Sequence, residues 1–240
     1  MRLELTADNH YRKQDRTTEY HVSMSGSEII LRLKSYWVLK LVLGSGLIAM
    51  FAALYFLPQR YPIVPATVLH PMRVEQMLPF MPDTVYLYES LWLLIPIAPW
   101  LMKTKEELNQ YSKGLMMMSG VGCCFFFLYP TMIPRPTDIQ DANMFYRKLV
   151  LIDSPLNAFP SLHAAYAVFH AALCHVTFGG GTRHKLLQGI FWSWALVIIF
   201  ATLLTKQHVF IDLVGGAMLG LGSFAIFCRS NTMSGHREVI

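Results

Sequence analysis

The sequence predicts an all-α protein, a six-transmembrane-helix bundle with both termini in the cytoplasm, and three observations support this prediction. Of the 240 residues, 54% are hydrophobic and only 15% are charged, with a mean hydropathy of +0.38, which lies outside the range of an ordinary soluble domain. Six apolar runs have roughly the 20 residues that one crossing of the hydrocarbon layer needs. Lys and Arg are shared unevenly between the loops. We expect a cytoplasmic N-terminal segment over 1–35, a six-helix membrane domain over 36–228 and a cytoplasmic tail over 229–240.

The apolar runs cover residues 36–57, 84–102, 112–130, 160–178, 186–204 and 209–228. We expect helices, because a backbone in lipid must satisfy its own hydrogen bonds and no alternating pattern indicates a barrel. Residues 58–83 carry six prolines and are expected to form an irregular or interfacial segment. The first 35 residues show no short apolar core followed by a cleavage site, so the first helix is expected to be its own insertion signal.

The orientation follows from the positive charges. The N-terminal segment, residues 103–113, residues 179–185 and the C-terminal tail together hold thirteen Lys and Arg, and the loops on the other side hold six. Because cytoplasmic loops carry the excess of Lys and Arg, both termini are predicted to be cytoplasmic. Contacts with anionic membrane lipids account for the net charge of +5, so no nucleic-acid partner is expected.

Three polar clusters stand at helix ends on the same side of this topology. Arg135 lies between two prolines after the third run, residues 157–163 open the fourth run, and residues 205–208 with Asp212 open the sixth. The end of the third helix and the starts of the fourth and sixth must share one face. Ionisable groups at a membrane boundary are costly, so this shared face is where we look for function.

His208 and Asp212 are four residues apart, so on a helix the carboxylate can accept a hydrogen bond from the imidazole. The other ring nitrogen is then presented as a neutral nucleophile. A purely structural hydrogen bond explains the same spacing.

His163 follows Ser161, a predicted helix N-cap. Free N–H groups at this helix end make an anion site, and the sixth helix offers a second one beside His208. A phosphate held there needs a donor to protonate the leaving alkoxide, and His163 is the available group. The alternative is a packed or interfacial histidine.

Arg135 and Lys206 are the candidate phosphate-binding cations, together with Ser161. A planar guanidinium binds two phosphate oxygens at once, and an ammonium adds a point charge. Alternatively, Arg135 and Lys206 simply extend toward lipid phosphates.

These residues resemble the type-2 phosphatidic acid phosphatase superfamily. Arg135-Pro136, Pro160-Ser161-Leu162-His163 and the His208–Asp212 spacing match its three motifs in order, and the strings NAFPSLHAAYA and TKQHVFIDLVGG are most similar to the branch of the inositol phosphorylceramide synthases. The resemblance implies that His208 becomes phosphorylated, that Asp212 is its partner, that His163 is the acid and later the base, and that Arg135 clamps the phosphate. It implies no cofactor and no metal.

The sequence departs from the family's motifs at four positions. Leu128 stands where the first motif has Lys, Ala201 and Thr202 stand where the third has Ser-Arg, and Leu162 replaces a Gly. The site therefore lacks two phosphate-binding cations of the family, and Lys206 is expected to replace one of them. The turn at Leu162 is expected not to need a positive φ angle.

Other polar residues are expected to be structural. His170 is predicted to be a buried, hydrogen-bonded histidine, and the four cysteines to pack without disulfides or zinc. Asp138, Asp141 and Asp153 are expected to be solvated loop carboxylates. Glycines of the sixth helix suit close helix packing.

Together these features predict an integral membrane lipid-phosphate phosphatase or phosphotransferase in a plasma or inner membrane, with its site on the non-cytoplasmic face. The acceptor is water or an alcohol, for example inositol or a sphingolipid-type alcohol. Two alternatives stay open. One is a metal-dependent hydrolase in which His163, His208, Asp212 and a loop aspartate bind a divalent ion. The other is a transporter or binder of anionic lipid headgroups without chemistry.

Overall fold

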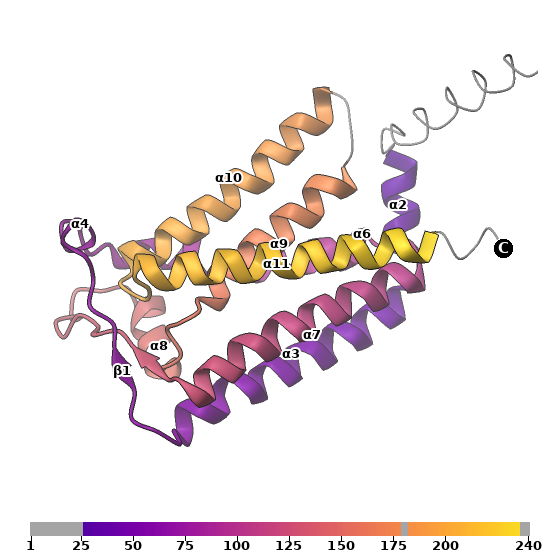
Figure 1. Ribbon diagram of the computed structural model, residues 1–240. Helices are drawn as coiled ribbons and strands as arrows, with labels where there is room; N and C mark the ends of the chain where they lie inside the picture. The colour runs from indigo at the N-terminus through magenta and orange to yellow at the C-terminus, as the bar shows by residue number, and fades with distance from the viewer. Residues whose placement is uncertain (1–25, 179–181, 236–240) are drawn as a thin grey trace, which may run out of the picture.

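The computed structural model describes residues 26–178 and 182–235, and it is mostly helical (Figure 1). The only strands in this part of the chain form one short pair. In chain order the elements are α2 (Gly26–Lys34), α3 (Trp37–Arg60), β1 (Thr67–Val68), α4 (Arg73–Gln76), η1 (Pro82–Thr84), α5 (Val85–Glu89), α6 (Leu91–Leu101), α7 (Lys105–Leu128), β2 (Thr131–Met132), α8 (Met144–Ile152), α9 (Leu162–Thr177), α10 (Thr182–Leu204) and α11 (Phe210–Gly235).

Four helices are long and apolar enough to cross a membrane, which indicates a membrane protein. They are Trp37–Arg60, Lys105–Leu128, Lys185–Leu204 and Phe210–Cys228. These correspond to four of the six predicted crossings, the first, third, fifth and sixth.

The other two predicted runs form shorter helices. Residues 84–102 are divided by a break at Ser90 into α5 and α6, and α6 contains Pro96 and Pro99. Residues 160–178 give α9, a helix of 16 residues of which twelve are buried inside the protein. The apolar side chains of α9 therefore serve the protein core.

The predicted start of the third helix was wrong. α7 begins at Lys105, where the Thr104 hydroxyl accepts a hydrogen bond from the Glu107 backbone N–H at 3.1 Å, so most of the predicted loop 103–113 is helical. α11 continues to Gly235, while its part that is apolar enough to cross a membrane, Phe210–Cys228, ends at the predicted residue 228. Of the predicted N-terminal segment, residues 1–25 lie outside the described residues and the remainder contains α2.

The core is built around α9, which packs against α11, α10, α6 and α7. A Cβ atom at Gly216 would lie 2.1 Å from the Ser161 carbonyl oxygen, and one at Gly220 would lie 2.5 Å from that of Ala165. Only glycine permits this approach of α11 to α9, which confirms the predicted close helix packing.

One end of the bundle carries the irregular segments. α4, β1 and α8 gather there, away from the C-terminal end of α11 (Figure 1). Strand β1 pairs in parallel with β2, with Thr67 opposite Thr131. The Thr131 carbonyl oxygen accepts the Ala158 N–H at 3.2 Å. These hydrogen bonds connect β1, within the predicted irregular segment 58–83, to β2, and β2 to Ala158, which precedes α9.

Candidate active site

His163 and His208 lie together at this end of the bundle. His163 is in the first turn of α9 and His208 stands just before α11. Their ring centroids are 5.7 Å apart and the rings are tilted by 53°. The sequence clusters that hold the two histidines, 45 positions apart along the chain, therefore lie side by side.

Asp212 fixes the orientation of His208. The His208 Nδ1–H donates to Asp212 Oδ2 at 2.9 Å, and the Val209 backbone N–H donates to Asp212 Oδ1 at 2.9 Å. The Asp212 side chain is 0% exposed and that of His208 is 8% exposed. Because Nδ1 holds the proton, Nε2 of His208 carries the lone pair that can act as a nucleophile.

Ser161 is the N-cap of α9, as the sequence predicts. Its hydroxyl oxygen accepts the Ala164 N–H at 3.3 Å, and its own backbone N–H donates to the Asp212 carbonyl oxygen at 2.9 Å. These bonds join the starts of α9 and α11. Ser161 is fully buried, and its contact with a phosphate stays a prediction.

The N-terminus of α11 differs from the expectation of a free anion site. The Phe210 N–H makes a short hydrogen bond to Oε1 of Glu75, and the Val209 N–H is bound to Asp212. Two carboxylates of the chain therefore occupy N–H groups that were expected to face a phosphate. Glu75 also accepts the Met72 N–H at 2.6 Å through Oε2.

Tyr88 is a site residue that the sequence analysis missed. Its ring stacks on His163 with centroids 4.2 Å apart and planes 24° apart. Its hydroxyl oxygen is 3.4 Å from His163 Nδ1. An aromatic residue within an apolar run gives no signal of such a contact.

Arg135 is held by Asp153, the C-cap of α8. Nη1 donates to the Asp153 carbonyl oxygen through a short bond, and Nη2 donates to Asp153 Oδ2 and to the Ser154 carbonyl oxygen at 3.2 Å each. Asp153 Oδ1 also accepts hydrogen bonds from Tyr55 and Gln59 at 2.9 Å each. The expectation that Asp153 is a solvated loop carboxylate was therefore wrong.

Two N–H groups of the Arg135 guanidinium, the Nε–H and one Nη1–H, are not used in the contacts with Asp153 and Ser154. Burial raises the pKa of the nearby Tyr146 hydroxyl, while the positive charge of Arg135 and a hydrogen bond from Gln207 act in the opposite direction. Arg135 follows β2 and is bound to Asp153 at the end of α8, so it belongs to the end of the bundle that carries β1 and α8.

Lys206 binds the segment that contains α4. Its ammonium group donates to the Leu78 carbonyl oxygen at 2.7 Å and to that of Glu75 at 3.3 Å. Burial lowers the pKa of Lys206 and the Glu75 carboxylate opposes this. The third ammonium N–H takes no part in these bonds, and a contact between Lys206 and phosphate stays a prediction.

The departures from the family motifs have clear positions. Leu128 is 79% exposed, whereas Ala201 and Thr202 are buried. The Thr202 carbonyl oxygen accepts the backbone N–H groups of Gln207 and His208, at 3.0 and 3.3 Å, which shapes the turn before α11. Leu162 has a negative φ angle, as expected.

His170 has the environment that the sequence predicts. His170 is fully buried, with Nε2 2.9 Å from the Tyr111 hydroxyl and Nδ1 2.7 Å from the Tyr166 carbonyl oxygen. The four cysteines are free thiols; Cys123 and Cys174 are buried, as predicted, whereas Cys124 is exposed. Within the described residues no group of His, Cys, Asp and Glu side chains has the arrangement of a metal site.

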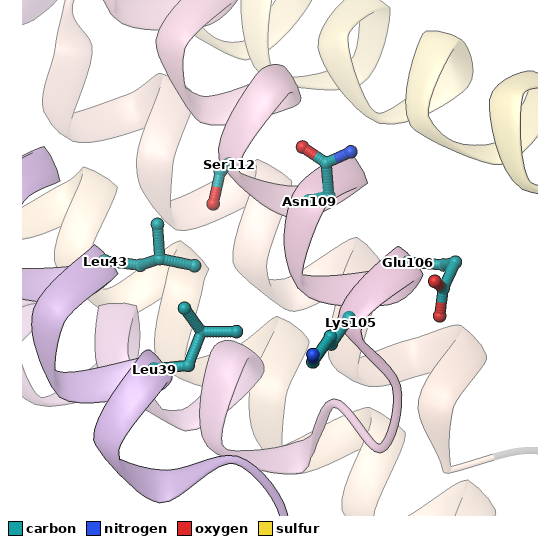
Figure 2. Close-up of a pocket in the computed structure, with 6 residues that line it drawn as sticks. All are labelled: Leu39, Leu43, Lys105, Glu106, Asn109 and Ser112. Carbon is teal, nitrogen blue, oxygen red and sulfur yellow. The ribbon is translucent and has the colours of Figure 1, made fainter.

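Two hollows lie on the surface of the bundle. One, of about 360 Å³, lies between α3 and α7 near their N-terminal ends, with leucines on one side and polar groups on the other (Figure 2). It is far along the bundle from the histidines. The second, of about 370 Å³, is lined by six apolar residues of α5 and α10, namely Leu87, Leu196, Val197, Phe200, Ala201 and Leu204. It adjoins the buried cluster that contains Tyr88.

Comparison with known proteins identifies a family. A family model described as the PAP2 superfamily matches residues 53–226. This range includes the histidine pair, Asp212, Arg135 and Tyr88. Neither the comparison with curated proteins nor the comparison with solved structures gives a match.

Proposed function

Since the chain belongs to the PAP2 superfamily, we propose that it is an integral membrane enzyme that removes or transfers the phosphoryl group of a lipid phosphate through a phosphohistidine. Membership indicates phosphatase-type or phosphotransferase-type activity on lipid phosphates. The observation that carries the finer proposal is the pair of imidazoles 5.7 Å apart, one of them held by a buried carboxylate at 2.9 Å.

In the first step Nε2 of His208 attacks phosphorus and the bond from phosphorus to the lipid oxygen breaks. His163 gives its proton to the departing alkoxide, so the lipid leaves as a neutral alcohol. Asp212 keeps the Nδ1 proton of His208 in place and stabilises the positive charge that develops on the ring. In the second step His163 takes a proton from the acceptor, whose oxygen displaces His208 from phosphorus.

Arg135 supplies the charge that the transferring phosphoryl group needs. Its bonds to Asp153 and Ser154 fix the guanidinium plane, and the free Nε–H and Nη1–H bind phosphate oxygens. The N–H groups at the start of α9 add a positive helix pole. Lys206 contributes its remaining N–H, and no metal ion is needed.

We further propose six crossings with both termini in the cytoplasm and the site on the non-cytoplasmic face. In this arrangement α5 and α6 together form the second crossing and α9 forms the fourth. A helix of 16 residues spans about 24 Å, a little less than the roughly 30 Å of the hydrocarbon layer. The surrounding helices cover this shorter helix, which supports the assignment.

The substrate is a lipid whose chain lies along the apolar hollow between α5 and α10. Ala201 belongs both to this hollow and to the buried cluster that contains Tyr88, whose ring stacks on His163. A chain in the hollow therefore ends close to the histidines. The resemblance to the inositol phosphorylceramide synthases favours transfer to an alcohol such as inositol or a sphingolipid-type alcohol over transfer to water.

A lipid panel tests this function. The purified protein is incubated with lipid phosphates and phosphodiesters, with and without polyol acceptors, and scored for free phosphate against new phosphodiester. We expect turnover that survives a strong chelator and is lost in His208→Ala. Loss of activity with the chelator, restored by a divalent ion, would support the metal-dependent alternative. Saturable lipid binding without turnover would support the transporter or binder.

A further inference from the structure

Tyr88 makes two contacts with the imidazole of His163. The rings stack with centroids 4.2 Å apart, and the hydroxyl oxygen lies 3.4 Å from Nδ1. Among the described residues, His163 is the one hydrogen-bond partner of this hydroxyl. Packing alone would need no hydroxyl here, and the phenol places a polar atom beside Nδ1.

We propose that Tyr88 is a positioning residue for His163: its stacked ring sets the plane of the imidazole and its hydroxyl contacts Nδ1, so that Nε2 exchanges the catalytic proton. The inference rests on the proposed function, in which His163 is first an acid and then a base. A histidine that shuttles a proton needs one nitrogen held constant, and an orienting partner on that nitrogen does this.

The structure holds Tyr88 itself rigidly. Tyr88 is 1% exposed and belongs to a buried cluster with Val85, Ala142, Tyr146 and Ala201. Ala201 stands where the family motif has Ser, and its small side chain forms part of this cluster. A rigid, buried phenol restricts the imidazole plane more than a mobile or solvated partner would.

The proton balance is the same as in the proposed mechanism. In the first step Nε2–H of the His163 imidazolium passes its proton to the alkoxide, and Nδ1 keeps its proton and stays beside the Tyr88 hydroxyl. In the second step Nε2 takes the proton of the acceptor hydroxyl and the imidazolium is restored. Tyr88 neither gains nor loses a proton.

The chain offers a matched control. Tyr111 and His170 form another buried tyrosine–histidine pair, with the hydroxyl 2.9 Å from Nε2 and both residues in the core. Tyr111→Phe removes the same kind of hydrogen bond from a histidine that has no role in the reaction. Thermal unfolding of both variants in detergent reports whether each one still folds.

The test compares leaving groups. Phosphoenzyme formation is followed as kcat/KM with a long-chain alkyl phosphate, whose alkoxide needs a proton, and with p-nitrophenyl phosphate, whose phenolate does not. Tyr88→Phe is expected to lose about tenfold or more with the alkyl phosphate, as for one hydrogen bond to a charged group, and less than about twofold with the aryl phosphate. Tyr111→Phe is expected to match the parent on both substrates.

Equal losses of Tyr88→Phe on the two substrates, or no loss on either, would overturn the positioning role. If Tyr88→Phe does not insert, Tyr88→Leu is assayed in the same way and must show the same selective loss. A parent protein that forms no phosphoenzyme with either substrate would instead refute the proposed function, so the two failures are distinguishable.

Discussion

Replacing Asp212 by Asn tests how the nucleophile is prepared. The carboxylate accepts hydrogen bonds from His208 Nδ1–H and from the Val209 N–H, each at 2.9 Å. An amide has one acceptor oxygen, so it can satisfy only one of these donors. If that oxygen keeps Val209, the amide N–H donates to Nδ1 and moves the imidazole proton to Nε2, the atom that must attack.

The magnitude follows from these two effects. Loss of one hydrogen bond to a charged group costs about 1.5–3 kcal/mol, which lowers the rate by roughly 10- to 150-fold. The wrong tautomer adds to this, and the corresponding amide in a Ser-His-Asp triad costs about 10⁴-fold. We therefore expect Asp212→Asn to slow phosphoenzyme formation by roughly 10²- to 10⁴-fold.

The assay is rapid-quench measurement of radiolabelled phosphoenzyme, with thermal unfolding as a check on the fold. Asp83→Asn is the matched control, because Asp83 lies at the same end of the protein, is exposed, and within residues 26–178 and 182–235 accepts only a hydrogen bond from Asn143, at 2.7 Å. It should react at the parent rate. If Asp212→Asn, correctly folded, formed phosphoenzyme as fast as the parent, the orienting role of Asp212 would be refuted.

Three further predictions concern the surroundings of the histidines. Asp153→Asn removes the charge that orients Arg135 and should lower kcat/KM by about tenfold, whereas the exposed Asp138→Asn should not; equal rates in a steady-state assay would contradict this. The Glu75 carboxylate accepts two backbone N–H groups, and the amide in Glu75→Gln can accept only one of them. The variant should therefore be less stable by about 1–3 kcal/mol, which a lower Tm in detergent would show. An unchanged Tm would exclude a stabilising role of Glu75 at the start of α11. Val197→Trp narrows the hollow between α5 and α10 and should slow turnover of long-chain substrates more than that of short-chain substrates. Leu221→Trp on α11 serves as the control. If chain length made no difference in Val197→Trp, the hollow would not be the binding site of the lipid chain.

The sequence predicted those parts of the site that depend on local spacing. The spacing of His208 and Asp212 predicted their hydrogen bond, which is present although His208 stands just before α11 and not on it. The Ser before an apolar helix is also its cap, as predicted. The prediction that the clusters of His163 and His208 share one end required only the order of the helices. Their catalytic and phosphate-binding roles stay predictions.

The tertiary contacts were not accessible from the sequence. Glu75 and Asp153 come from segments 135 and 18 positions away from their partners, and their neighbours in sequence form no motif. Tyr88 sits in an apolar run where packing is the default expectation. Hydropathy also does not distinguish a lipid-facing helix from α9, whose apolar residues are buried against other helices.

The starts of α8 and α7 are marked in the sequence by capping residues. Asn143 is followed by a nine-residue amphipathic segment, and its side chain accepts the Tyr146 N–H at 2.9 Å as the cap of α8. Thr104 followed by Glu107 marks the start of α7 in the same way. Attention to capping residues would have placed both helices.

The central claim is that a phosphoryl group is carried on one histidine beside another. The most direct measurement is acid-free trapping of the protein during turnover of a radiolabelled lipid phosphate, followed by peptide mapping at alkaline pH. We expect label on His208 that is absent in His208→Ala and that accumulates in His163→Ala when an aryl phosphate is the donor, because the second step then lacks its base. Turnover with no label on His208, or with label on another residue, would contradict it.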